Sequence, residues 1–230
     1  MTRSRSTARG RWRRPVRAWV AALLCACAAR APVARTATAD ALRPGATPLE
    51  VARAFYSALH AGDAAAAGRL VASRNGARVA ESFVAIAGAY RLLEDALRTA
   101  YGEDAAGAVG YRARVEAEDE AMARATQVVR VDDAVVSAGD QLLATLRREG
   151  GGWRVVLDDA LTTDTGVAAI AREAAATRAA SERVAPAIQH RLFGSAEDAV
   201  EAFRNEVMAQ MGREEEELPD EEGAEAPLTL

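Results

Sequence analysis

The strongest constraint on the fold is a change of hydrophobic period near Gly102. Before it, apolar residues recur every three or four positions, which is the spacing of one helix face; after it, apolar and charged residues alternate as in a half-buried strand. Helical spacing returns after residue 160. The sequence therefore predicts an α+β fold, with helices packed on a curved antiparallel sheet and further helices added at the C-terminal end.

Three helices are predicted before the change of period. The first begins at the capping box Thr47-Pro48-Leu49-Glu50 and ends at Gly62, and Asp63 can cap a short second helix over residues 64–71. The run Arg74-Asn75-Gly76 indicates a turn. A third helix follows from a stripe of apolar residues, namely Phe83, Ile86, Tyr90, Leu93, Leu97 and Tyr101.

Four strands are expected over residues 111–118, 125–131, 141–148 and 153–158. The connection Glu149-Gly150-Gly151-Gly152 predicts that the last two form a hairpin, because glycine readily adopts the positive φ that tight loops need. Trp153, Val155 and Leu157 alternate onto one face of the last strand. We expect that face to pack on the third helix.

Two more helices are predicted after the strands. Thr162-Thr163-Asp164 can cap an alanine-rich helix that runs to Pro186 and has a thin apolar face. Ser195-Ala196-Glu197-Asp198 opens the last helix, whose apolar stripe consists of Ala199, Val200, Phe203, Val207 and Met211. An isolated helix of this length is marginally stable in water, so its apolar stripe must be covered by its own domain, by a second copy of the chain or by a partner protein. We favour the hypothesis that its own domain covers it. The acidic stretch at 213–230 is expected to be disordered.

The first 26 residues have the pattern of a secretory signal. Seven arginines precede an apolar run from Ala18 to Ala29, which is too short for a bilayer span of roughly 20 residues. The Arg13-Arg14 pair leaves twin-arginine export as an alternative, although Pro15 and Arg17 interrupt the pattern. We expect an exported protein of the periplasm or cell envelope.

The order Leu24-Cys25-Ala26-Cys27 resembles a bacterial lipobox, which would make Cys27 the acylated residue of the mature chain. Residues 27–46 would then be a flexible tether, and a lipid anchor the only contact with the membrane. The alternative is an ordinary signal cleaved later, for instance after Ala37-Thr38-Ala39.

Composition excludes several chemistries. Beyond Cys27 there is no cysteine, and the chain has no lysine, so neither a thiolate nucleophile nor a lysine Schiff base is available in the body of the protein. Without residues 1–26, 22 basic residues face 33 acidic ones, a net charge of −11 that disfavours binding to nucleic acid. His60 and His190 stand far apart and are expected to be capping or surface residues. No metal site and no cofactor are expected.

Three segments carry a resemblance to a known family. They are TPLEVARAFY at 47–56, Gly62-Asp63, and EGGGWRVV at 149–156. The chain over about residues 47–160 resembles small exported members, often lipoproteins, of the nuclear transport factor two-like, or cystatin-like, cone fold. Residues 161–230 lie outside the resemblance.

The resemblance implies a curled antiparallel sheet around helices, with a cone-shaped cavity. In various members that cavity holds a steroid, an epoxide, a polyketide or only side chains, so the resemblance does not settle function. No residue set matches the catalytic motif of any one member. No catalytic residue is therefore assigned.

Five residues are candidates for lining such a cavity: Tyr56, Tyr90, Tyr101, Tyr111 and Asp158. The favoured alternative is that the tyrosines are core residues with solvated hydroxyls and that the aspartate only ends a strand. The leading hypothesis is a noncatalytic domain that binds a small ligand or a protein, with a homo-oligomer as one form of partnership. A first alternative is a small isomerase, dehydratase or hydrolase that uses a buried acid and tyrosines. A second is a structural interaction protein that acts through its C-terminal helices.

Overall fold

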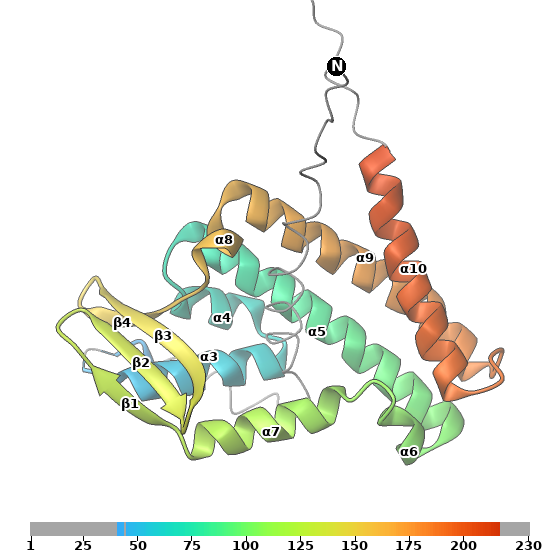
Figure 1. The fold of residues 1–230 in the computed structure, drawn as a ribbon, viewed down its shortest axis with the longest axis horizontal. Coiled ribbons are helices and arrows are strands. Elements are labelled where there is room, and N and C mark those ends of the chain that lie inside the picture. The colour runs from blue at the N-terminus through green and yellow to red at the C-terminus, as the bar shows by residue number, and fades with distance from the viewer. Residues whose placement is uncertain (1–40, 44, 217–230) are drawn as a thin grey trace, which may run out of the picture.

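The computed structural model describes residues 41–43 and 45–216, and Figure 1 shows their arrangement. Helices dominate both ends of this part of the chain, and the strands follow one another in the middle. In chain order the elements are α3 (Pro48–Ala61), α4 (Ala64–Leu70), α5 (Arg74–Tyr101), α6 (Glu103–Ala106), α7 (Tyr111–Ala123), β1 (Thr126–Val129), β2 (Asp133–Ala138), β3 (Gln141–Glu149), β4 (Gly152–Val156), α8 (Asp159–Thr162), α9 (Asp164–Gln189) and α10 (Ala196–Glu216). The chain is an α+β protein, as predicted.

The first two helices begin where the sequence predicts. The hydroxyl of Thr47 accepts a hydrogen bond from the Glu50 N–H at 3.2 Å, and the Glu50 carboxylate accepts one from the Thr47 N–H at 2.7 Å. Gly62 ends α3 with a φ of 75°, and Asp63 caps α4 by accepting from the Ala66 N–H at 2.9 Å. Each cap joins residues three positions apart, so it could be predicted from the local sequence.

The turn expected at residues 74–76 is wrong, because these residues form the first turn of α5. Ser73 is the N-cap, and its hydroxyl accepts a hydrogen bond from the Gly76 N–H at 3.0 Å. The long helix that results, 28 residues in length, starts well before the predicted stripe.

The strand expected over residues 111–118 is also wrong, because this run lies within helix α7. Its buried side chains, Tyr111, Val115 and Met122, lie on one face of a helix. Ala113 and Ala117, which complete the alternating pattern, are exposed. Alanine is small enough to be tolerated on either side, so the alternation carried no information about burial.

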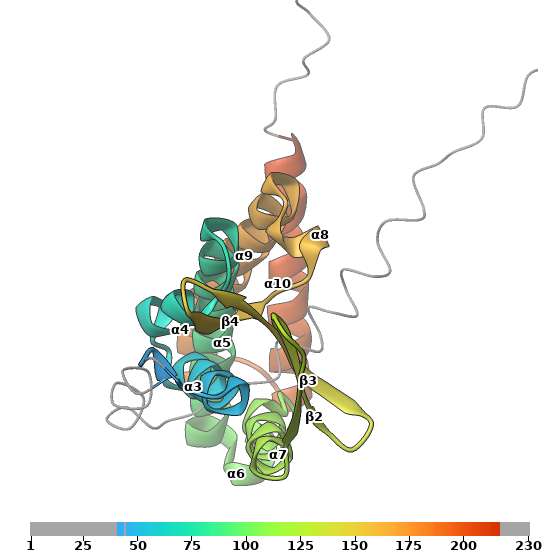
Figure 2. The ribbon, with the colours of Figure 1, turned by 90° about the vertical axis from the view of Figure 1, so that its left-hand side faces the viewer.

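The sheet is a four-stranded antiparallel meander with the order β1-β2-β3-β4. The sequence prediction included β1, β3 and β4 but missed β2, which buries only Ala134 and Val136. Figure 2 shows the sheet as a curved layer with α3 and α4 on one side of it. On the free edge of β4, Val155 forms an isolated parallel β-bridge with Val71.

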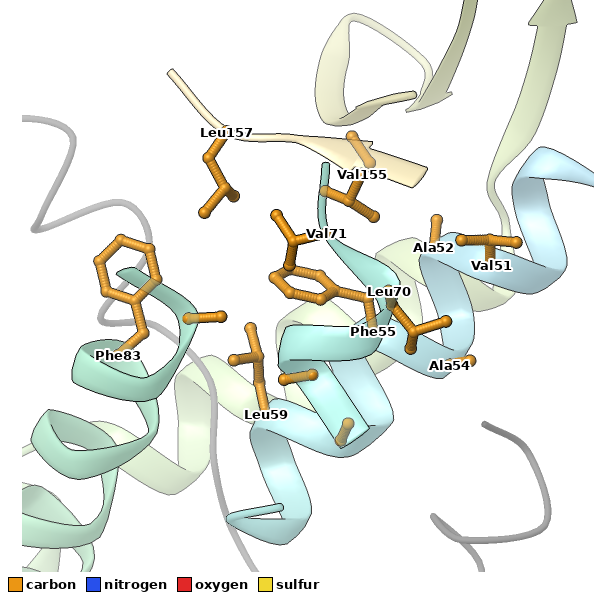
Figure 3. Close-up of a cluster of buried hydrophobic side chains, with 14 of the residues drawn as sticks. Val51, Ala52, Ala54, Phe55, Leu59, Leu70, Val71, Phe83, Val155 and Leu157 are labelled. Atoms are coloured by element: carbon orange, nitrogen blue, oxygen red, sulfur yellow. The ribbon is translucent and has the colours of Figure 1, made fainter. Parts of the chain in front are cut away.

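The β3–β4 hairpin turns at Gly150 and Gly151, which have φ values of 58° and 82°. Trp153, Val155 and Leu157 are all buried, which confirms that they share one face. That face rests mainly on α3 instead of the predicted third helix, which is α5. In Figure 3, Val155 and Leu157 lie over Phe55 of α3, and Phe83 of α5 reaches the cluster at its Leu157 end.

The C-terminal helices build a second core around the other end of α5. Small buried residues line the facing sides of α5 and α9, and this lets the two long helices pack closely along their length. Pro186 does not end α9, which continues to Gln189. Helix α10 packs on α9 and buries Phe203, so its apolar stripe is covered by its own chain. The expected division at residue 160 stays a prediction.

Several expectations concern residues outside the described part: the signal at 1–26, Cys27 and its alternatives, the tether up to residue 40, and the tail at 217–230. Two corrections fall at its borders. Ala41 and Ala46, at the end of the expected tether, are buried in the core, and α10 extends to Glu216, into the expected disordered tail. Among the described residues, no helix is long and apolar enough to cross a membrane.

Candidate functional site

The candidate site is a groove where β3 and β4 separate. The last paired residues of the two strands are Thr145 and Val156, so β3 extends beyond its partner toward Gln141. The Tyr56 hydroxyl, from α3, donates a hydrogen bond at 2.7 Å to the carbonyl of Leu143, in the part of β3 that pairs with β2 but not with β4. The tyrosine thus provides a hydrogen-bond partner for a backbone carbonyl that β4 does not reach.

The groove has a volume of about 470 Å³. Its walls come from α3, from the start of β3 and from the end of β4 with the residues that follow it. The lining residues are Phe55, Tyr56, Leu142, Leu143, Ala144, Thr145, Val155, Val156, Leu157, Asp158 and Asp159.

The inner wall of the groove is part of the protein core. Phe55, Val155 and Leu157 are buried, and Figure 3 shows the three side chains converging. Leu142, at the rim, is 55% exposed. The site is therefore an apolar surface that is continuous with the core at one side and open to solvent at the other.

The charged residues of the groove, Asp158 and Asp159, are adjacent in the sequence and lie at one end of it. Asp158 is half-buried and caps α8, where its carboxylate accepts a hydrogen bond from the Ala160 N–H at 2.8 Å. Asp159 is exposed. None of the eleven lining residues is basic.

Two of the five predicted cavity residues, Tyr56 and Asp158, line the groove. The other three take part in helix packing and do not line this groove. The rings of Tyr90 and Tyr111 stack at 6.5 Å, and the ring of Tyr90 also meets Phe203 edge-on at 5.6 Å. The Tyr101 hydroxyl donates to the carbonyl of Phe193 at 2.7 Å. Tyr111 lies here because residues 111–118 form a helix that packs on α5.

A second polar group, which the sequence did not reveal, joins α3 to α7. His60 is 6% exposed, which corrects its assignment as a capping or surface residue. Its ring nitrogens lie 3.4 Å from Glu118 Oε2 and 3.1 Å from Asp119 Oδ1. Burial raises the pKa of Glu118, while the hydrogen bond with His60 acts in the opposite direction.

Glu94 is a further buried carboxylate, on α5. It accepts a hydrogen bond from the Arg112 N–H at 3.2 Å, and an Arg98 guanidinium nitrogen lies 3.7 Å away. Burial nevertheless raises the pKa of Glu94. The group anchors the first turn of α7 to α5.

These polar groups do not combine into a recognisable reaction centre. The acids of the groove are half-buried Asp158 and exposed Asp159. The two acids whose pKa burial raises, Glu94 and Glu118, are not among the groove's lining residues. Within residues 41–43 and 45–216, no group of three or more His, Cys, Asp or Glu could hold a metal ion. The arrangement is suited to holding an apolar molecule by one charged or polar end.

Comparison with known proteins gave no match: no protein-family model fits the chain, and no curated protein or solved structure resembles it significantly.

Proposed function

We propose that the chain is an exported, lipid-anchored, noncatalytic domain that binds a small apolar molecule in the groove between β3 and β4. The observation that carries the proposal is the volume of about 470 Å³ behind separated strands. Small-molecule sites commonly have volumes of about 300–1,000 Å³, with mostly apolar walls and a few polar groups. The secretion pattern and the lipobox-like order at Cys27 support the cellular part of the proposal.

The distribution of acids favours binding over catalysis. An acid–base enzyme needs a carboxyl group whose pKa is shifted toward neutrality and which reaches the substrate. Here burial raises the pKa of Glu118, but this residue pairs with His60 between α3 and α7 and does not line the groove. The Tyr56 hydroxyl is engaged with a backbone carbonyl.

The second alternative, a protein that acts through its C-terminal helices, has less support. Phe203, the largest residue of the apolar stripe on α10, is buried against the chain itself. A small-molecule groove is therefore the better candidate for the primary site.

Fluorescence titration of the purified chain with 1-N-phenylnaphthylamine, a neutral apolar probe, tests the proposal. Saturable binding is expected. Leu142→Asp should weaken it about tenfold, because the partial loss of one leucine contact costs on the order of 1.4 kcal/mol. Val131→Asp is the matched control, since Val131 is 84% exposed at the same sheet but does not line the groove.

Two results would contradict the proposal. One is the absence of saturable probe binding by a folded chain. The other is an equal loss of affinity in both aspartate variants, which would place the probe elsewhere on the sheet.

A further inference from the structure

We propose that the groove selects amphipathic cations: molecules with an apolar body and a protonated amine or quaternary ammonium group at one end. This inference rests on the proposed function, because it names the class of ligand for the same groove. The apolar body would lie along Phe55, Val155 and Leu157, and the cationic group would lie at the end formed by Asp158 and Asp159.

The first argument is the sign of the charge at the groove. Asp158 and Asp159 are the only charged residues among the eleven that line it. None of the arginines in the described part of the chain lines the groove. An anionic amphiphile, such as a fatty acid, would find two carboxylates and no countercharge there.

The second argument is that these two charges are not neutralised. Neither Asp158 nor Asp159 forms an ion pair with any residue of the described part of the chain. Asp158 accepts one hydrogen bond, from the Ala160 N–H, and this fixes its position beside the groove. The Asp159 carboxylate makes no hydrogen bond with a described residue. A bound cation could therefore pair with these carboxylates without displacing an existing ion pair.

The third argument is the aromatic wall. Tyr56 lines the groove, and its hydroxyl is held by the Leu143 carbonyl. An aromatic face attracts ammonium groups, and quaternary ammonium groups are commonly recognised in this way. The same ring gives no attraction to an anionic head group, so it reinforces the preference that the carboxylates create.

Displacement of 1-N-phenylnaphthylamine by three molecules with the same decyl chain tests the preference. The competitors are decyltrimethylammonium, decyl maltoside and decanoate, each below its critical micelle concentration and at low salt. The cation should displace the probe at a concentration at least about tenfold lower than decanoate, with the neutral compound between them, since two nearby carboxylates attract the cation and repel the anion even in a water-like dielectric. The preference should shrink as salt is added.

Variants then assign the preference to the two carboxylates. The double variant Asp158→Asn, Asp159→Asn should lose the preference for the cation, so that decyltrimethylammonium and decanoate displace the probe at similar concentrations. Asparagine caps helices as well as aspartate does, so α8 should keep its start. Asp140→Asn is the control, because Asp140 is exposed in the β2–β3 turn and does not line the groove.

The outcomes separate the two proposals. Cation selection is overturned if the chain binds the probe but all three decyl compounds displace it at the same concentration. It is also overturned if the double variant keeps the wild-type preference for the cation. Either result leaves the groove as a binding site. Failure of the wild-type chain to bind the probe overturns both.

Discussion

Replacing Phe203 with alanine should destabilise the whole chain, because this side chain joins α10 to the second core. Phe203 is 2% exposed, and its ring meets Tyr90 at 5.6 Å with an interplanar angle of 66°. Removing a fully buried phenylalanine costs about 3–5 kcal/mol, and the edge-to-face ring pair accounts for about 0.5–1.5 kcal/mol of such a cost. In a domain of this size, each kcal/mol lowers Tm by about 2–4 °C. We therefore expect Tm to fall by about 6–20 °C.

Thermal melts followed by circular dichroism, at two protein concentrations tenfold apart, measure this effect. Met208→Ala is the matched control, because Met208 lies on the same helix but is 55% exposed and should change the free energy of unfolding by less than about 0.5 kcal/mol. If Phe203→Ala leaves Tm within about 2 °C of the wild type, α10 is not part of the core. If the loss depends on protein concentration, α10 is covered by a second copy instead of its own chain.

Two other predictions address the anchor and the buried acids. Cys27→Ser should abolish acylation and move the protein from the detergent phase to the aqueous phase, as checked by intact mass and detergent partitioning; equal partitioning of both proteins would end the lipoprotein proposal. Glu94→Gln should raise Tm more at pH 7.5 than at pH 4. Because the folded pKa of Glu94 is raised, its ionised form costs stability above that pKa, and below the unfolded pKa the cost is absent. A larger gain at pH 4 would show that the pairing with Arg98 and the Arg112 N–H outweighs burial.

The elements that the sequence predicts correctly are those whose signal is local. The capping box Thr47–Glu50 joins residues three apart, and so does the bond between Ser195 and Asp198 at the start of α10. The glycines of the β3–β4 hairpin act within a single loop. Such contacts depend only on neighbouring residues, so a single sequence contains them in full.

The errors arise where alanine carries the pattern or where the contact is distant. In the segment at 111–118, the alternation of apolar and charged residues resembles a strand only if the exposed alanines count as apolar. The helix prediction would have needed the spacing of Tyr111, Val115 and Met122 to be given more weight. Strand β2 has only two buried side chains, which is too little signal to stand out.

The same distinction between local and distant contacts separates the residues of the candidate site that the sequence predicts from those that it does not. Tyr56 and Asp158 lie beside segments that were correctly assigned, and both line the groove. The positions of Tyr90 and Tyr111 depend on α7 and α10, which meet α5 only in three dimensions. His60 and Glu118 are 58 residues apart, and their contact requires α7 to be a helix at that place. Neither residue could be paired with the other from the sequence alone.

The groove itself follows from the conformation at the end of β4. Asp158 has φ −52° and ψ 132°, and its carboxylate caps α8, so the chain turns into a helix immediately after the strand. This turn carries the chain away from β3 at Thr145 and leaves the Leu143 carbonyl to the Tyr56 hydroxyl. Asp158, two residues beyond the end of β4, therefore both caps α8 beside the groove and places a negative charge at the end of the groove. A substitution that let β4 pair with β3 beyond Thr145 would narrow the space between the strands and shift the Asp158 carboxylate, so the shape of the site and its proposed selectivity both depend on where β4 ends.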